Sequence, residues 1–253
     1  NQPFVYKDCV LVCNGEIYNY PILKKELENE YTFKSGSDCE VLIPLYDKYG
    51  IEILCKFLDA EFAMVLYDVK EKKIMAARDP MGIRPMFYGY SKTSGDICFA
   101  SEAKSLISLC DDIMPFPPGH YYLDGKFICF NDLSDPKTIN TDDLDTIAIN
   151  LKTKLEKAVK KRFMSDAPIG YLLSGGLDSS LVCAIAARLN SRPIRTFAIG
   201  METDPIDLKY ARQVADFLGT EHTEVVMSKE DILTNLKEVI FHLETYDITT
   251  IRA

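Results

Sequence analysis

The sequence has no excess of positive charge: Asp and Glu outnumber Lys and Arg by 38 to 29, for a formal net charge of −9. Such a chain offers no electrostatic footprint for a phosphodiester backbone, so we do not expect nucleic acid as a partner. No apolar run approaches the about 18 residues of a membrane span, and residue 1 begins no signal peptide, so no membrane partner is expected. These absences favour a cytoplasmic protein.

The eight cysteines lack the compact spacing of a disulfide scaffold. They are scattered between Cys9 and Cys183 and include no Cys-x-x-Cys pair. We therefore expect reduced thiols that lie mostly in the core, as is usual in the cytoplasm.

Length and composition predict two globular domains. The chain has 253 residues, of which 47% are hydrophobic and 26% charged, and can bury two cores of ordinary size. Over Asn131–Asp143 the residues shift to Asn, Asp, Ser, Pro and Thr, which is typical of a linker. We expect a first domain at residues 1–135 and a second at residues 136–253.

The first domain combines short apolar runs with helical patterns, which predicts an α+β fold. The runs that predict strands are Cys9–Cys13, Glu61–Asp68, Lys73–Arg78, Pro85–Tyr90 and Ile97–Ala100. Apolar residues at helical spacing predict helices over Pro21–Asn29 and Asp38–Tyr49, with Gly50 as a stop.

The second domain alternates strands and helices, which predicts an α/β fold with a parallel, doubly wound sheet. The predicted strands are Ile169–Leu173, Ile194–Ile199 and Thr223–Met227. The predicted helices are Ser179–Leu189, Asp207–Leu218 and Lys229–Leu243. A basic stretch between Lys152 and Arg162 overlies a helical apolar stripe from Leu144 to Val159, and we interpret it as a solvated helix face.

The segment Ser174–Ser180, of sequence Ser-Gly-Gly-Leu-Asp-Ser-Ser, joins a predicted strand to a predicted helix. Gly175 and Gly176 let backbone N–H groups approach a phosphate, and the helix N-terminus presents further donors and its positive dipole end. Asp178 would repel a bare phosphate, so it predicts a ligand for Mg²⁺ held between the carboxylate and a nucleotide. The absence of Gly-Lys-Ser or Gly-Lys-Thr excludes the Walker loop, and a plain Gly-Ser turn is the structural alternative.

This string resembles the pyrophosphate-binding signature of the ATP pyrophosphatase fold, which occurs in asparagine synthetases, GMP synthetase and argininosuccinate synthetase. The resemblance implies that ATP is cleaved to AMP and pyrophosphate while a carboxylate or carbonyl oxygen is activated. It implies nucleotide contacts at Leu172, Ser174, Gly175, Gly176, Asp178, Ser179 and Ile199.

The stretch Glu244–Ala253 is close to a string characteristic of asparagine synthetases. That resemblance implies that Thr249 and Arg252 help to bind aspartate and the phosphates. The chemistry is suitable, because an Arg fork matches a carboxylate or phosphate and a Thr hydroxyl adds a donor. Taken alone, Arg252 would be interpreted as a surface salt-bridge residue.

The segment Asn14–Asn19, of sequence Asn-Gly-Glu-Ile-Tyr-Asn, follows the predicted strand Cys9–Cys13 and in isolation predicts a polar turn. It resembles the same segment of class II glutamine amidotransferases, whose fold is an N-terminal-nucleophile αββα sandwich. The resemblance implies that the Asn14 side chain and the Gly15 N–H form an oxyanion hole, where fixed donors commonly supply several kcal/mol. It also implies that Asn14, Gly15, Glu16 and Asp38 bind glutamine.

The sequence departs from the amidase pattern at residue 1, which is Asn where the family has a cysteine nucleophile whose α-amino group serves as base. The upstream arginine that holds the glutamine carboxylate is also absent, as are the second acidic motif and the lysine of the synthetases. We therefore expect a parent protein that extends in both directions, and no glutaminase activity from these 253 residues alone.

The resemblance to glutamine-hydrolysing asparagine synthetases implies a ligase that makes asparagine from aspartate and glutamine-derived ammonia. It implies ATP and Mg²⁺ as cofactors, β-aspartyl-AMP as an intermediate, and AMP and pyrophosphate as products. A homodimer is left open. Two alternatives also stay open: a related enzyme that adenylates another carboxylate, such as a β-lactam synthetase, and a non-catalytic fragment.

Overall fold

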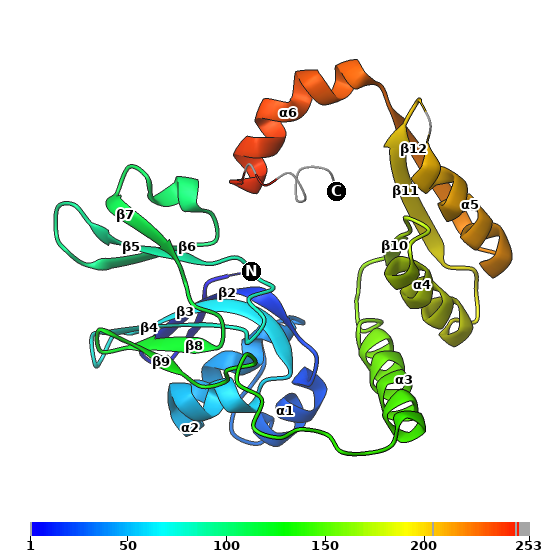
Figure 1. Ribbon diagram of the computed structural model, residues 1–253. Coiled ribbons are helices and arrows are strands. Elements are labelled where there is room, and N and C mark those ends of the chain that lie inside the picture. Colours follow the sequence, from blue (N-terminus) through cyan, green and yellow to red (C-terminus); the bar gives the residue numbers. More distant parts are fainter. Residues whose placement is uncertain (1, 204, 246, 248–253) are drawn as a thin grey trace. The chain divides into compact units, whose positions relative to one another are not determined.

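The computed structural model describes residues 2–203, 205–245 and 247 (Figure 1). It divides into two compact units, Asn1–Ile139 and Asn140–Ala253. Each unit has a hydrophobic core of its own.

The first unit contains a six-stranded antiparallel sheet in the order β1-β2-β3-β4-β8-β9. Its strands are β1 (Phe4–Tyr6), β2 (Cys9–Ile17), β3 (Ala60–Asp68), β4 (Lys73–Arg78), β8 (His120–Leu123) and β9 (Lys126–Cys129). A second, three-stranded antiparallel sheet has the order β6-β5-β7, formed by β5 (Phe87–Ser91), β6 (Ile97–Ala100) and β7 (Cys110–Pro115). The sequence patterns predicted neither β1 nor β7 to β9.

Side-chain alternation places the large sheet between two cores. Phe62 and Met64 of β3 point to one face, where they pack in one cluster with buried residues of α1 (Tyr20–Leu27) and α2 (Leu42–Phe57). Ala63, between them, points to the other face and packs with Phe116 and the partly buried aromatic residues of the small sheet. The described layers are therefore helices, large sheet and small sheet.

The helix predicted over Asp38–Tyr49 consists of a short 3-10 helix, η1 (Asp38–Val41), followed directly by α2. The predicted stop at Gly50 is a break within α2, because Gly50 has φ 76° and ψ 172° and the helix resumes at Ile51. Glycine reaches this conformation without the Cβ clash that other residues meet.

The second unit contains three parallel strands in the order β10-β11-β12. Its elements are α3 (Leu144–Lys161), β10 (Gly170–Leu172), α4 (Leu177–Leu189), β11 (Arg195–Met201), α5 (Ile206–Leu218), β12 (Glu221–Met227) and α6 (Lys229–Leu243). Buried residues of α4 and α5 pack in one cluster with Ala198 of β11, so both helices cover the same face of the sheet. The mixed α/β class is confirmed, whereas helices on the second face, which a doubly wound sheet requires, stay a prediction.

Local signals set the helix ends in this unit. The Asp143 side chain accepts a hydrogen bond from the Thr146 N–H at 2.9 Å and caps α3. Ser228 and Asp231 form a reciprocal capping box at the start of α6. Gly219 ends α5 in the left-handed conformation, with φ 65°.

The predicted apolar stripe of α3 is buried only toward the C-terminal end of the helix. Within the predicted stripe of α3, Val159 is buried and Leu155 partly buried, but Leu144 and Leu151 remain exposed.

All eight cysteines are free, and all but Cys98 and Cys129 are buried, as predicted. Among the described residues, no helix is both long and apolar enough to cross a membrane.

Candidate functional site

Asn14, Gly15 and Glu16 lie on strand β2 and not in a turn, so the prediction from the isolated segment is wrong. β2 continues to Ile17, and its residues pair with β3 without interruption, including Asn14 with Ala63 and Gly15 with Phe62. Alternate residues of β2 direct their backbone groups to β3, so this ladder holds Asn14 and Glu16, and with them Gly15, in an extended conformation.

Gly15 is required by close packing against β3. A Cβ at this position would lie 2.6 Å from the Glu61 carbonyl oxygen and 2.9 Å from the Phe62 Cβ. No side chain fits there without moving one of the two strands.

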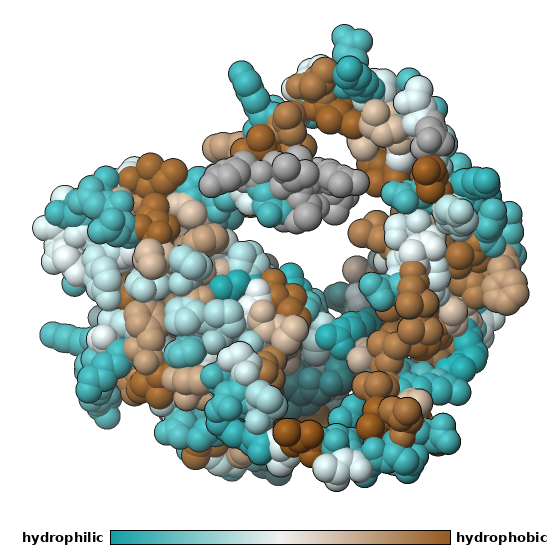
Figure 2. Space-filling model, in the orientation of Figure 1, coloured by the Kyte–Doolittle hydropathy of each residue, from teal (hydrophilic) through white to brown (hydrophobic). Residues whose placement is uncertain are grey.

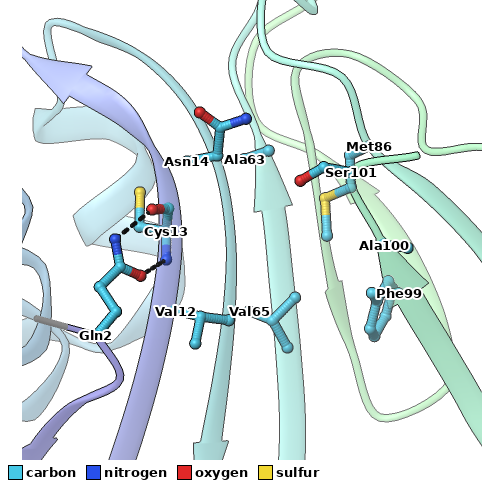
Figure 3. A pocket seen from close by; sticks show the side chains of 10 residues that line it. All are labelled: Gln2, Val12, Cys13, Asn14, Ala63, Val65, Met86, Phe99, Ala100 and Ser101. Carbon is cyan, nitrogen blue, oxygen red and sulfur yellow. Dashed lines mark hydrogen bonds between the residues drawn. The ribbon is translucent and has the colours of Figure 1, made fainter. Parts of the chain in front are cut away.

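Asn14 borders a pocket of about 240 Å³ between the two sheets (Figure 3). The pocket is lined by Gln2, Val12, Cys13, Asn14, Ala63, Val65, Met86, Phe99, Ala100 and Ser101. The figure shows Asn14 and Ala63 next to one another on neighbouring strands, with Phe99 and Ser101 on the other side of the pocket. The Asn14 side chain is exposed toward this space.

The edge of β2 that faces away from β3 is open around Gly15. In an antiparallel pair, alternate residues direct their N–H and C=O groups to opposite sides. On this outer side, both backbone groups of Cys13 bind the Gln2 side chain, and the Ile17 N–H donates to Asp38 Oδ2 at 2.6 Å. Between them, the Gly15 carbonyl accepts from the Cys39 thiol at 3.5 Å, and the Gly15 N–H meets no acceptor in the described part of the chain. The structure therefore brings Asp38 next to the strand that carries Asn14, Gly15 and Glu16.

A buried carboxylate, Glu40, fixes the turn that precedes Asp38, and the sequence patterns gave no sign of it. Glu40 is 2% exposed and accepts hydrogen bonds from the Tyr31 hydroxyl, the Lys34 and Ser35 N–H groups and the Ser35 hydroxyl. Burial alone would raise the pKa of Glu40, but these hydrogen bonds to the charged form hold the pKa below its ordinary value.

Arg78, at the end of β4, and Asp79, directly after it, form hydrogen bonds with backbone groups. Asp79, which is 1% exposed, accepts from the N–H groups of Phe62, Met81, Ile83 and Arg84. Arg78 donates to the carbonyl oxygens of Gly82, Arg84 and Phe116. These bonds tie the loop after β4 to β3, close to the Asn14 strand.

In the second unit, the loop Leu173–Gly176 leads from β10 into α4. The helix begins at Leu177, two residues earlier than predicted, so Asp178 and Ser179 lie in its first turn. The N–H groups of this first turn have no acceptor within the helix, which makes the N-terminus a site for an anion.

Gly175 allows the loop to approach α5. It has φ +77°, and a Cβ would lie 2.5 Å from the Tyr210 carbonyl carbon and 2.6 Å from the Ala211 nitrogen. Both the backbone conformation and the space require glycine here.

Ser174 and Ser179 are held together, with their hydroxyl oxygens 3.0 Å apart and the Ser174 N–H donating to Ser179 Oγ at 3.3 Å. Asp178 is exposed, and no side chain caps the start of α4. In the described part of the chain, no group of three or more His, Cys, Asp and Glu residues is arranged to hold a metal. A single carboxylate suits Mg²⁺ that arrives with a nucleotide, because this ion takes most of its ligands from phosphate and water.

Leu172 and Ile199 project from the face of the sheet opposite α4 and α5. Leu172 of β10 pairs with Phe197 of β11, and Ile199 follows two positions later on the same face. Leu172 is 83% and Ile199 48% exposed, so both offer free apolar surface. Thr249 and Arg252 lie outside the described residues.

The chain matches two family models that agree with this arrangement. Residues 1–120 match the glutamine amidotransferase domain family, and residues 150–253 match the asparagine synthase family.

Curated relatives match along the whole chain. Asparagine synthetase [glutamine-hydrolyzing] 2 of Arabidopsis thaliana is 43% identical over 267 aligned positions, which include 100% of this chain and 45% of that protein. The probable asparagine synthetase of Schizosaccharomyces pombe is 42% identical, over 100% of this chain and 49% of its own length. Asparagine synthetase 1 of Saccharomyces cerevisiae is 41% identical, over 100% of this chain and 50% of its own length.

The chain thus spans about half the length of the curated relatives it matches. Over all of its 253 residues it is similar to glutamine-hydrolysing asparagine synthetases, with one part that matches the glutamine amidotransferase domain family and one that matches the asparagine synthase family.

Proposed function

We propose that this chain supplies the glutamine-hydrolysing and ATP-binding parts of an asparagine synthetase. In the first domain, residues 1–135, glutamine would release ammonia. In the second, residues 136–253, aspartate would be activated with ATP to β-aspartyl-AMP and converted to asparagine, with release of AMP and pyrophosphate. The eight free cysteines support a cytoplasmic setting.

One observation carries the amidase proposal: the Gly15 N–H points from an open strand edge beside the Asn14 side chain at the pocket. An oxyanion that forms during amide hydrolysis needs donors that are fixed before the reaction and not used elsewhere. Gly15 and Asn14 supply one backbone and one side-chain donor, while Glu16 and Asp38 supply carboxylates for the glutamine amino group.

In the second domain, the donors at the start of α4 would hold the pyrophosphate portion of ATP, with Ser174, Gly175, Gly176 and Ser179 shaping the loop. Leu172 and Ile199 offer the apolar surface for the adenine ring. Asp178 is the residue that would hold Mg²⁺, which when bound offsets the charge that develops on the phosphates. Thr249 and Arg252 are proposed for aspartate and phosphate on the sequence resemblance alone.

The fold proposal follows the same division. For the first unit we propose an N-terminal-nucleophile sandwich, which has two sheets between helices; the described helices, large sheet and small sheet supply three of its four layers. The parallel β10-β11-β12 sheet with its strand-to-helix loop supports an ATP pyrophosphatase fold.

The proposal is tested by assaying a protein of the relatives' full length that carries this sequence. It should release glutamate from glutamine, and it should form AMP, pyrophosphate and asparagine from ATP, aspartate and either glutamine or ammonia. Adenylation of a different carboxylate, with no asparagine formed, would reject the aspartate assignment. Failure to release glutamate would reject the amidase assignment.

A further inference from the structure

The Gln2 side chain takes the place of a strand at the outer edge of β2 (Figure 3). The ladder between β1 and β2 ends at the pair Phe4 and Leu11. The next residue of β2 whose backbone groups point to this edge is Cys13. Its N–H donates to Gln2 Oε1 at 2.7 Å, and Gln2 Nε2 donates to its carbonyl oxygen at 2.6 Å. A primary amide has one acceptor and two donors in one plane, so it can bind both groups as a neighbouring backbone would.

An amide differs from a backbone strand in how far it reaches. A strand that continued along this edge would also bind the N–H and C=O of Gly15. The Gln2 amide satisfies Cys13 and ends there. On the same side the Gly15 carbonyl accepts from the Cys39 thiol, and the next backbone N–H with an acceptor is that of Ile17, which donates to Asp38. Gly15 is therefore held from both sides while its own N–H stays open.

We infer that Gln2 is a positioning residue for glutamine hydrolysis, which sets the oxyanion donors of Asn14 and Gly15 by replacing a backbone strand at Cys13. The inference rests on the proposed amidase function. Gln2 acts through Cys13, the residue directly before Asn14, and not by touching the reacting atoms. A displacement of fixed donors by a fraction of an ångström is costly, because donor geometry is what the transition state depends on.

The decisive variant is Gln2→Met in a protein of the relatives' full length, because Met matches Gln in size but cannot form either hydrogen bond. We expect kcat for glutamate release to fall roughly tenfold, with KM changed less than about twofold. Ammonia-dependent formation of AMP should keep its wild-type rate.

Asn19 provides a control, because its side-chain amide also binds one backbone carbonyl and one backbone N–H, here of two different residues, and it does not line the pocket. Its Nδ2 donates to the Phe57 carbonyl at 2.8 Å, and its Oδ1 accepts from the Asp59 N–H at 3.1 Å. Asn19→Leu should lower the melting temperature at least as much as Gln2→Met while the folded protein keeps its kcat.

A second variant keeps the inference testable if Gln2→Met folds poorly. Gln2→Glu retains the acceptor for the Cys13 N–H and regains a donor only when its carboxyl group is protonated. Its kcat relative to the wild type should therefore rise as the pH falls, which a purely structural role would not produce.

Wild-type kcat in Gln2→Met, or an equal loss of kcat in Asn19→Leu, would overturn the inference. A wild-type protein that releases no glutamate would instead overturn the proposed function, so the two failures can be told apart.

Discussion

The two units leave backbone N–H groups without acceptors in opposite ways. At the start of α4, several donors are free because a helix leaves its first turn without acceptors. On β2, the Gly15 N–H is open because β1 stops pairing with β2 at Leu11, and Gln2 and Asp38 bind the Cys13 and Ile17 positions on either side of it. A helix N-terminus thus provides open N–H donors through secondary structure alone. At a strand edge, side chains must bind the neighbouring backbone groups before a single open N–H donor is set apart.

The difference also concerns charge. The first turn of α4, which is proposed to receive an anion, carries an exposed carboxylate, Asp178. At the strand site, Asp38 accepts from the Ile17 N–H, and the buried Glu40 is bonded to the turn before Asp38. We therefore expect the helix site to depend most on charge and the strand site most on the position of single donors.

The largest effect is expected for Asp178→Asn, which keeps the shape of the side chain but removes its charge. If Asp178 holds Mg²⁺ against the pyrophosphate, the transition state for adenylation loses several kcal/mol, or roughly a thousandfold in rate. Pyrophosphate release with aspartate and ammonia measures this loss.

Glutamate release by the same Asp178→Asn protein serves as the control and should persist, because it takes place in the other domain. Near wild-type pyrophosphate formation with unchanged Mg²⁺ dependence would leave Asp178 as an acidic residue that stabilises the helix dipole.

The next largest effect is expected for Asn14→Ala, which removes one oxyanion donor. Glutamine-dependent synthesis should fall by about 10²- to 10³-fold, while ammonia-dependent synthesis continues. Steady-state rates with the two nitrogen sources separate these outcomes. Equal losses with both would show that Asn14 acts through the structure of the sheet.

A smaller effect, on stability, is expected for Glu40→Gln. Hydrogen bonds hold the pKa of Glu40 below its ordinary value of 4.5, so the ionised form stabilises the fold above that pH. At pH 7 the free energy of unfolding of the variant, measured with urea, should be roughly 1.5–3 kcal/mol lower than that of the wild type. This difference should shrink as the pH falls through the pKa of Glu40 in the folded state. A constant difference from pH 7 to pH 3 would contradict this account.

The smallest effect is expected for Gly219→Ala, at the end of α5. Gly219 has φ 65° and open space around it, so the only cost of the alanine is its left-handed backbone conformation. This should lower the free energy of unfolding by about 1 kcal/mol. Both activities should stay unchanged in the folded protein. Loss of either activity would mean that the end of α5 influences a site.

The strand–loop–helix arrangement around Ser174–Ser180 could be predicted from the sequence because all its parts are local, while its phosphate-binding role stays a prediction. Gly175, Gly176, Asp178 and Ser179 follow one another between a strand and a helix, and the structure keeps that order. Only the helix start was misplaced, since an N-terminus without a capping side chain gives no clear sequence signal.

The amidase strand was harder to predict, because distant parts of the chain define it. Asn14 and Gly15 favour a turn by local preference, but pairing with Ala63 and Phe62 of β3 keeps them extended. Glu40 and Asp79 satisfy backbone groups that no spacing rule identifies, and Gln2 meets Cys13 only once β1 has paired with β2.

The open edge of β2 also has a consequence for solubility. An unpaired strand edge is a template on which another extended chain can add, and proteins usually block it with charge, proline or a covering segment. Here a side-chain amide binds Cys13 and a carboxylate binds Ile17, so backbone groups that an added strand would need are already used on either side of Gly15. A variant that lost both groups would therefore be expected to aggregate as well as to lose the proposed glutamine hydrolysis, because the proposed oxyanion donor is also a group that a foreign strand could bind.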